Sequence, residues 1–228
     1  MKPVIGIIAR SGAFSDTNKF FVNQKVVRAV ANNGAIPILL LPVDGMDYEM
    51  DAPSKLPRLT EENINDLRSM VDKCDGIIIP GGSKWYQFDY EITKYALEKD
   101  IPILGICAGM QLLASIFTNK SLPDISVFNE EHLKPELDYV HEVNIKEDSK
   151  LYQILKKNKI QVNSLHRSCI TTIDSEYIIG TTNNYIESIE DKTKKFVLGL
   201  QWHPEGMLTY DEDAKLIFEA FIEATKKD

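Results

Sequence analysis

Cys107 is a residue whose type and setting suit nucleophilic chemistry. It follows a short apolar run, residues 101–106, and precedes a stretch that has helical periodicity from Met110 onward. Gly105 and Gly109 flank it, and a strand and a helix can approach closely there because glycine has no Cβ atom. A nucleophile at such a strand-to-helix elbow projects from the end of a sheet, and the helix N-terminus favours its thiolate form. A lone cysteine at a strand end is more often a packing residue, so other parts of the chain must decide between the two interpretations.

Two further strand ends carry residues that suit acyl transfer. Residues 80–82 (Pro-Gly-Gly) end one strand, where the N–H groups of Gly82 and Ala108 could converge as an oxyanion hole. His203 ends another strand, and Glu205 could hold its imidazole as a general base. Taken alone, residues 80–82 would be interpreted as a simple turn and His203 as a core or surface histidine. Open α/β sheets bind ligands beyond the carboxyl ends of their strands, so three such ends together favour one site.

The elements that must position these residues alternate between strand and helix in the first half of the chain. This pattern predicts an α/β fold with a single doubly wound, mostly parallel sheet and flanking helices. Buried strands are predicted at residues 4–9, 35–41, 74–80 and 101–106, and helices at 20–32, 60–73 (with Thr60 as N-cap), 89–99 and from 110. Loops are predicted at residues 10–18 and 44–57.

The second half is richer in strand-like segments. We expect a loop or cover at residues 121–139, extra strands at 140–145, 160–162, 177–182, 185–189 and 196–201, and an amphipathic helix at 211–226. A tight turn at Asn183-Asn184 would join two of these strands. No internal repeat or low-complexity linker interrupts the sequence, so residues 1–228 are predicted to form one domain.

The composition excludes several classes of function. A net charge of −8 without a basic stripe argues against nucleic-acid binding. The chain has no apolar run of about 18 residues and no signal-peptide pattern, so we expect no membrane span. Its three cysteines show no C-x-x-C spacing, which indicates neither a disulfide framework nor a zinc knuckle and favours a reducing cytoplasm.

Several motifs resemble those of a known superfamily. Gly105-Ile-Cys-Ala-Gly-Met-Gln111, Gln201-Trp-His-Pro-Glu205 and the preceding Pro80-Gly-Gly82 look like the class I glutamine amidotransferase superfamily, over essentially the whole chain. Val162-Asn-Ser-Leu-His166 resembles a segment of the γ-glutamyl-γ-aminobutyrate hydrolase family, which is peptidase C26-like. Further segments share that likeness: residues 3–7, 34–42, 75–82 and 141–143.

The resemblance implies a flavodoxin-like fold and assigns roles to particular residues. It implies a Cys107–His203–Glu205 triad, with Gly82 and Ala108 as the oxyanion donors. The implied substrate-binding residues are Gln111, at the α-amino or α-carboxylate end of a γ-glutamyl group, and His166 beside the triad. We predict Gly81, Ser164 and Arg167 as further substrate-binding residues.

Three departures from the family pattern concern substrate choice. Ala108 stands where the family often has Arg or Lys, Arg167-Ser168 follows the second histidine, and residues 82–89 form a short segment. Arg167 could pair with a substrate carboxylate, although an exposed loop arginine is more often only solvated.

We therefore expect a hydrolase of γ-glutamyl amides, such as γ-glutamyl-γ-aminobutyrate or related γ-glutamyl amines and peptides, that works through a γ-glutamyl thioester. No cofactor is expected. His132 and His141 could suggest a metal, but no carboxylate partner pattern accompanies them and the mechanism needs no metal.

Two alternatives stay open: a glutaminase subunit that delivers ammonia to a separate synthase, and a catalytically silent binding or regulatory protein. The sequence decides neither the leaving amine nor whether the chain forms a homodimer.

Overall fold

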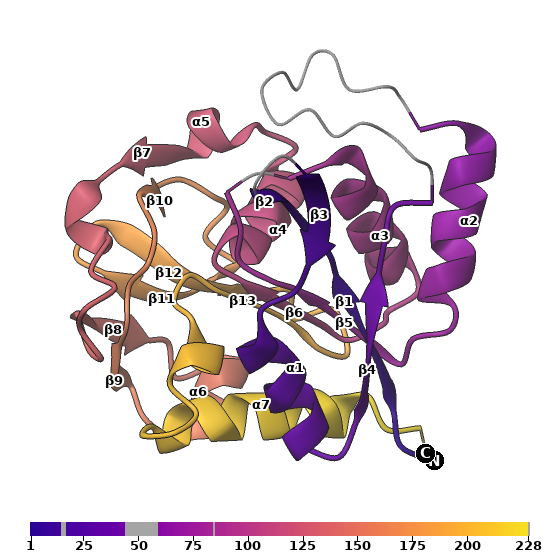
Figure 1. Cartoon of the computed structure of the whole chain (residues 1–228). Coiled ribbons are helices and arrows are strands. Elements are labelled where there is room, and N and C mark those ends of the chain that lie inside the picture. Colours follow the sequence, from indigo (N-terminus) through magenta and orange to yellow (C-terminus); the bar gives the residue numbers. More distant parts are fainter. Residues whose placement is uncertain (15–16, 44–58, 84, 228) are drawn as a thin grey trace.

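A large mixed sheet forms the centre of the molecule (Figure 1). The computed structural model describes residues 1–14, 17–43, 59–83 and 85–227. In this part of the chain, eleven strands join in the order β4-β1-β5-β6-β13-β12-β11-β8-β9, with β10 and β7 continuing from β12.

The first half of this sheet is parallel. It consists of β4 (Ile36–Leu40), β1 (Val4–Ile8), β5 (Gly76–Ile79), β6 (Ile103–Ile106) and β13 (Val197–Leu200). In order of occurrence the strands run 2-1-3-4-5, which is the flavodoxin-like order. The predicted α/β fold with a parallel sheet is therefore confirmed.

The second half of the sheet is antiparallel and contains the extra strands predicted for this part of the chain. Its strands are β12 (Tyr185–Glu190), β11 (Ile178–Thr182), β8 (His141–Ile145), β9 (Lys159–Val162), β10 (Ser168–Ile170) and β7 (Ser126–Phe128). The predicted turn at Asn183 joins β11 to β12, and the φ of +47° at this residue is the left-handed conformation that a tight hairpin turn requires.

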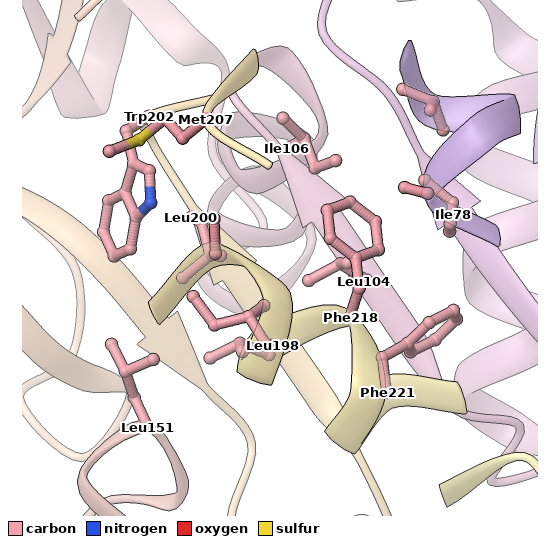
Figure 2. Close-up of a cluster of buried hydrophobic side chains, with 14 of the residues drawn as sticks. Ile78, Leu104, Ile106, Leu151, Leu198, Leu200, Trp202, Met207, Phe218 and Phe221 are labelled. Carbon is pink, nitrogen blue, oxygen red and sulfur yellow. The ribbon is translucent and has the colours of Figure 1, made fainter. Parts of the chain in front are cut away.

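Helices cover both faces of the sheet. One face carries α1 (Gln24–Asn32), α6 (Lys150–Leu155) and α7 (Glu212–Ala224), and the other carries α2 (Glu61–Val71), α3 (Gln87–Glu98) and α4 (Ala108–Thr118). Figure 2 shows Phe218 and Phe221 of α7 packed near Leu104 and Leu198 of the sheet. Each fully buried phenylalanine contributes about 1.5–3 kcal/mol of transfer free energy. Because both faces are covered, the central strands are apolar throughout, and the elbow is held at the end of a rigid layer.

Side-chain caps fix where the helices begin. The Thr60 hydroxyl accepts a hydrogen bond of 3.1 Å from the Asn63 N–H, which confirms Thr60 as the N-cap of α2. Asp211 caps α7 in the same way, through a 2.8 Å bond from the Ala214 N–H.

The prediction of a loop at residues 10–18 is wrong. β2 (Arg10–Phe14) and β3 (Thr17–Phe21) pair as an antiparallel two-stranded sheet, so the following helix begins at Gln24 and not at Phe20. The side chain of Asn23 accepts a hydrogen bond from the Lys25 N–H, which starts the helix there.

Other local expectations also need correction. β4 is an edge strand and not a fully buried one, with Ile36 45% exposed. Residues 121–139 contain α5 (Leu122–Ile125), β7 and a 3₁₀ turn, η2 (Glu130–His132). Neither α6 nor β10 was predicted, because elements of three to six residues are too short to show a clear hydrophobic period. The predicted loop at residues 44–57 lies outside the described residues.

Candidate active site

Cys107 lies in a strained turn between β6 and α4. Its φ of 52° and ψ of −106° are values that residues with a side chain rarely adopt. A Cβ atom on Gly109 would come within 2.0 Å of the Ile79 carbonyl oxygen, and one on Gly105 within 2.9 Å of the Gly109 oxygen. The prediction that this elbow needs glycines on both sides is therefore confirmed: any side chain there would push α4 away from the sheet.

His203 and Glu205 lie at the carboxyl end of β13, where the chain enters the 3₁₀ turn η3 (Pro204–Gly206). The Nδ1 atom of His203 is 2.7 Å from Oε1 of Glu205, and the Glu205 side chain is only 3% exposed. Burial lowers the pKa of His203, but the Glu205 carboxylate and the Cys107 side chain, which hydrogen-bonds to the imidazole, raise that pKa well above its usual value. This environment favours an imidazolium beside the cysteine sulfur.

A cavity of about 470 Å³ opens beside these groups. Both Cys107 and His203 line it. Four other residues singled out in the sequence line it as well: Gly82, Gln111, His166 and Arg167. A volume of this size suits a small ligand.

Arg10 braces the Pro80–Gly82 loop from behind, a role that the sequence did not indicate. Its guanidinium donates to the Pro80 oxygen at 2.7 Å, to the Gly81 oxygen at 3.3 Å and to the Asp89 carboxylate at 2.9 Å. A trans peptide carries its C=O and N–H on opposite sides, so the Gly82 N–H points away from Arg10. This orientation leaves the Gly82 N–H available as a donor toward the cavity that Gly82 lines.

Asn163 was also missed as a positioning residue. Its Oδ1 accepts a hydrogen bond of 2.8 Å from the His203 N–H, while its Nδ2 donates to the His203 oxygen at 2.9 Å. These two bonds join the segment after β9 to the histidine. The Val162-Asn-Ser-Leu-His166 motif contained this residue, but its role depends on a contact across forty positions of sequence.

Two of the anticipated substrate-binding residues are engaged within the protein. The Gln111 Nε2 donates to the Ser168 oxygen at 3.0 Å and to the Gln201 Oε1 at 3.2 Å. Ser164 is fully buried, and its hydroxyl donates to the His132 oxygen at 2.6 Å, which favours a structural role. Gly81 borders a smaller cavity on the Arg10 side.

Three histidines and a glutamate gather beside the cavity, and one of them, His166, also lines it. One nitrogen each of His132, His141 and His166 and one carboxylate oxygen of Glu187 all lie within 4.8 Å of one another, and we call these residues the His–Glu cluster. Burial lowers the pKa of His141 to about 4 and that of His166 to about 3, and it raises the pKa of Glu187 to about 8. The expectation that His132 and His141 lack a carboxylate partner is therefore wrong. His, His, His and Glu are side chains that could hold a metal ion.

Comparison with known proteins gives consistent results. A family model described as Peptidase C26 matches residues 84–205. The chain is 28% identical to the glutamine amidotransferase-like protein RP404 of Rickettsia prowazekii, over 99% of this chain and 98% of that protein. It is 26% identical to the gamma-glutamyl-gamma-aminobutyrate hydrolase PuuD of Escherichia coli, over 97% of this chain and 93% of the relative.

Among solved structures, the chain is similar in fold to the glutaminase domain of Trypanosoma brucei CTPS. The TM-score is 0.70 at 19% identity, over 100% of this chain and 95% of that one. Within the described residues, no helix has the length and apolar character needed to span a bilayer.

Proposed function

The chain belongs to the peptidase C26 family, and we propose that it is a cysteine-dependent hydrolase of γ-glutamyl amide bonds. The observation that carries the proposal is the meeting of two strand ends at one cavity. Cys107 of the β6–α4 elbow and His203 at the end of β13 both line it, and Glu205 holds the far side of the imidazole.

Acylation begins at the Cys107 sulfur. The thiolate attacks the γ-carbonyl carbon of the substrate, and the carbonyl electrons move onto oxygen. The N–H groups of Gly82 and Ala108 stabilise this oxyanion. As the intermediate collapses, the C–N bond breaks, His203 gives its proton to the leaving amine, and a γ-glutamyl thioester remains on Cys107.

Deacylation uses the same groups in the opposite sense. The now neutral His203 takes a proton from water, and the oxygen of that water attacks the thioester carbon. The C–S bond breaks, glutamate leaves, and the thiolate is restored beside a protonated His203. Glu205 stays ionised and keeps the imidazole oriented.

Substrate choice would depend on the wall formed by residues 165–168. Arg167 is exposed at the cavity and could pair with a carboxylate of the substrate, while His166 faces the same space. A guanidinium there supports preference for a substrate that carries a free carboxylate.

Release of glutamate by the purified chain tests the proposal. The panel would contain glutamine, γ-glutamyl-γ-aminobutyrate and several γ-glutamyl amines and peptides. We expect turnover of a γ-glutamyl amide in preference to glutamine, and a loss of about 10⁴-fold or more in kcat for Cys107→Ala. Cys74→Ala is the matched control, because Cys74 is also buried but lies beside Gly6 on β1.

Each result decides between the candidate functions. Undiminished hydrolysis by Cys107→Ala would overturn the mechanism. Turnover of glutamine alone, increased by an added synthase, would favour a glutaminase subunit, an alternative supported by the fold shared with the CTPS glutaminase domain. No turnover of any substrate, with the wild-type chain folded, would favour a binding protein.

A further inference from the structure

The His–Glu cluster collects its four members from four separate segments. His132 ends η2, His141 begins β8, His166 follows β9, and Glu187 lies within β12. Oε1 of Glu187 is 3.8 Å from the His132 Nδ1 and 3.9 Å from the His166 Nε2, and Oε2 is 3.9 Å from the His141 Nε2. Three imidazole nitrogens therefore surround one carboxylate at nearly equal distances.

These distances are too long for hydrogen bonds. The Glu187 side chain is 0% exposed, and neither of its oxygens has a hydrogen-bond partner among the described residues. The three facing histidine nitrogens also lack partners within the described part of the chain. A buried carboxylate without a partner is costly unless a nearby cation compensates its charge.

The spacing suits a shared ion. Two ligands that each lie about 2.1 Å from a tetrahedral zinc ion are about 3.4 Å apart. The three Glu187–histidine distances would shorten by about 0.4–0.5 Å to reach that separation, and ligand atoms that lie up to 4.8 Å apart would approach by up to about 1.4 Å through side-chain rotation. We propose that the His–Glu cluster binds a divalent transition-metal ion, best matched by Zn²⁺, through His132 Nδ1, His141 Nε2, His166 Nε2 and the Glu187 carboxylate.

The surroundings of His166 support this assignment. Its Nδ1 is 3.2 Å from the Ser168 carbonyl oxygen, to which a protonated Nδ1 donates. This tautomer leaves a lone pair on Nε2, directed at the cluster. A metal-ligating histidine commonly donates its other ring N–H to a carbonyl in this way. Imidazole and carboxylate ligands suit zinc, and they also suit iron, nickel and copper.

Four protein ligands make a closed site, so the expected role of the ion is structural. The segment that carries His166 also carries Leu165, Arg167 and Ser168, which line the cavity. An ion at the cluster would join this segment to η2, β8 and β12 and so fix one wall of the cavity. This inference does not depend on the proposed hydrolysis, and no step of that reaction passes through the ion.

Metal content of the full chain provides the test. The protein would be purified without a metal-affinity tag, equilibrated with Zn²⁺, dialysed against metal-free buffer and analysed by elemental mass spectrometry. We expect roughly one zinc ion per wild-type chain. Glu187→Gln and His141→Ala should lose it. Glu190→Gln should keep it, because Glu190 lies on the same strand, is also buried and hydrogen-bonds instead to the Lys150 N–H.

A second measurement uses only the wild-type sequence, so it holds even if a variant does not fold. Co²⁺ added to chelator-treated protein should produce the intense visible absorption of four-coordinate cobalt, and Zn²⁺ should remove it. Absence of that absorption, together with a zinc content of the wild-type chain far below one ion, would overturn the proposal. Zinc retained equally by His141→Ala would also overturn it, because the ion would then be held elsewhere.

Discussion

Gly81 packs its Cα directly against the ring of His203. A Cβ atom at position 81 would come within 2.6 Å of His203 Cε1 and 3.5 Å of Cys107 Cβ. The loop that follows β5 can therefore approach both strand ends only because this residue has no side chain. The next residue, Gly82, lines the same cavity as Cys107.

Gly81→Ala should therefore impair catalysis more than folding. The added methyl group would displace the imidazole, and a displacement of about 1 Å costs roughly 100-fold in rate. We expect kcat/KM for γ-glutamyl amide hydrolysis to fall by about that factor, with a small change in Tm. Gly34→Ala is the control, since a Cβ atom there meets no atom within 4 Å and its strained φ of +81° affects stability while kcat/KM stays unchanged. Equal activity of the two variants would contradict this prediction.

The buried ion pair behind the Pro80–Gly82 loop should contribute strongly to stability. Arg10 is 5% exposed and Asp89 0%, so Asp89→Asn leaves a buried guanidinium without its counter-charge. We expect a loss of about 3 kcal/mol in the free energy of unfolding, measured by urea titration. Asp148→Asn, which breaks the exposed pair with Lys192, should leave the unfolding curve unchanged. An equal change in the free energy of unfolding for both variants would show that the Arg10–Asp89 pair does not stabilise the fold through its buried charges.

The three cysteines should differ in reactivity. Burial raises the pKa of Cys74 to about 11 and that of Cys169 to about 12, so both thiols stay protonated near neutral pH. Cys107 lines the cavity beside His203, whose pKa is raised well above its usual value. Iodoacetamide at about pH 7.5 should therefore alkylate Cys107 first, as peptide mass mapping would show. Faster labelling of Cys74 or Cys169 would argue against an activated Cys107.

The Glu205 carboxylate should make stability depend on pH through His203. A histidine whose pKa is raised in the folded state stabilises the fold fully below its unfolded pKa of about 6.5, and this contribution disappears as the pH rises through the folded pKa. Glu205→Gln removes a group that raises the His203 pKa. The variant's deficit in the free energy of unfolding should therefore be largest between about pH 5 and 6.5 and shrink at higher pH. The change amounts to about 1.4 kcal/mol for each unit by which the substitution lowers the His203 pKa.

Urea unfolding of wild type and Glu205→Gln at several pH values measures this dependence. The same substitution in a His203→Asn background is the control, and its deficit should not change with pH. A constant deficit in the presence of His203 would mean that the carboxylate does not influence the imidazole.

Features that depend on neighbouring residues were predictable from the sequence. The elbow at Cys107 follows from a β-branched apolar run between glycines, and the alternation of strands and helices follows from hydrophobic periodicity. The N-cap at Thr60 was likewise predictable, because it depends only on residues adjacent in the sequence. Right-handed crossovers then limit how such units can form a sheet, which is why the parallel half was also predictable.

Contacts between distant segments required the tertiary structure. Arg10 was expected in a polar loop, yet pairing between β2 and β3 turns it under the Pro80–Gly82 loop. Glu187 lies on a strand whose sequence gives no sign that His132, His141 and His166 will surround it. Local patterns report which face of an element is buried. They do not report which buried polar groups meet, because strand order and register bring those groups together.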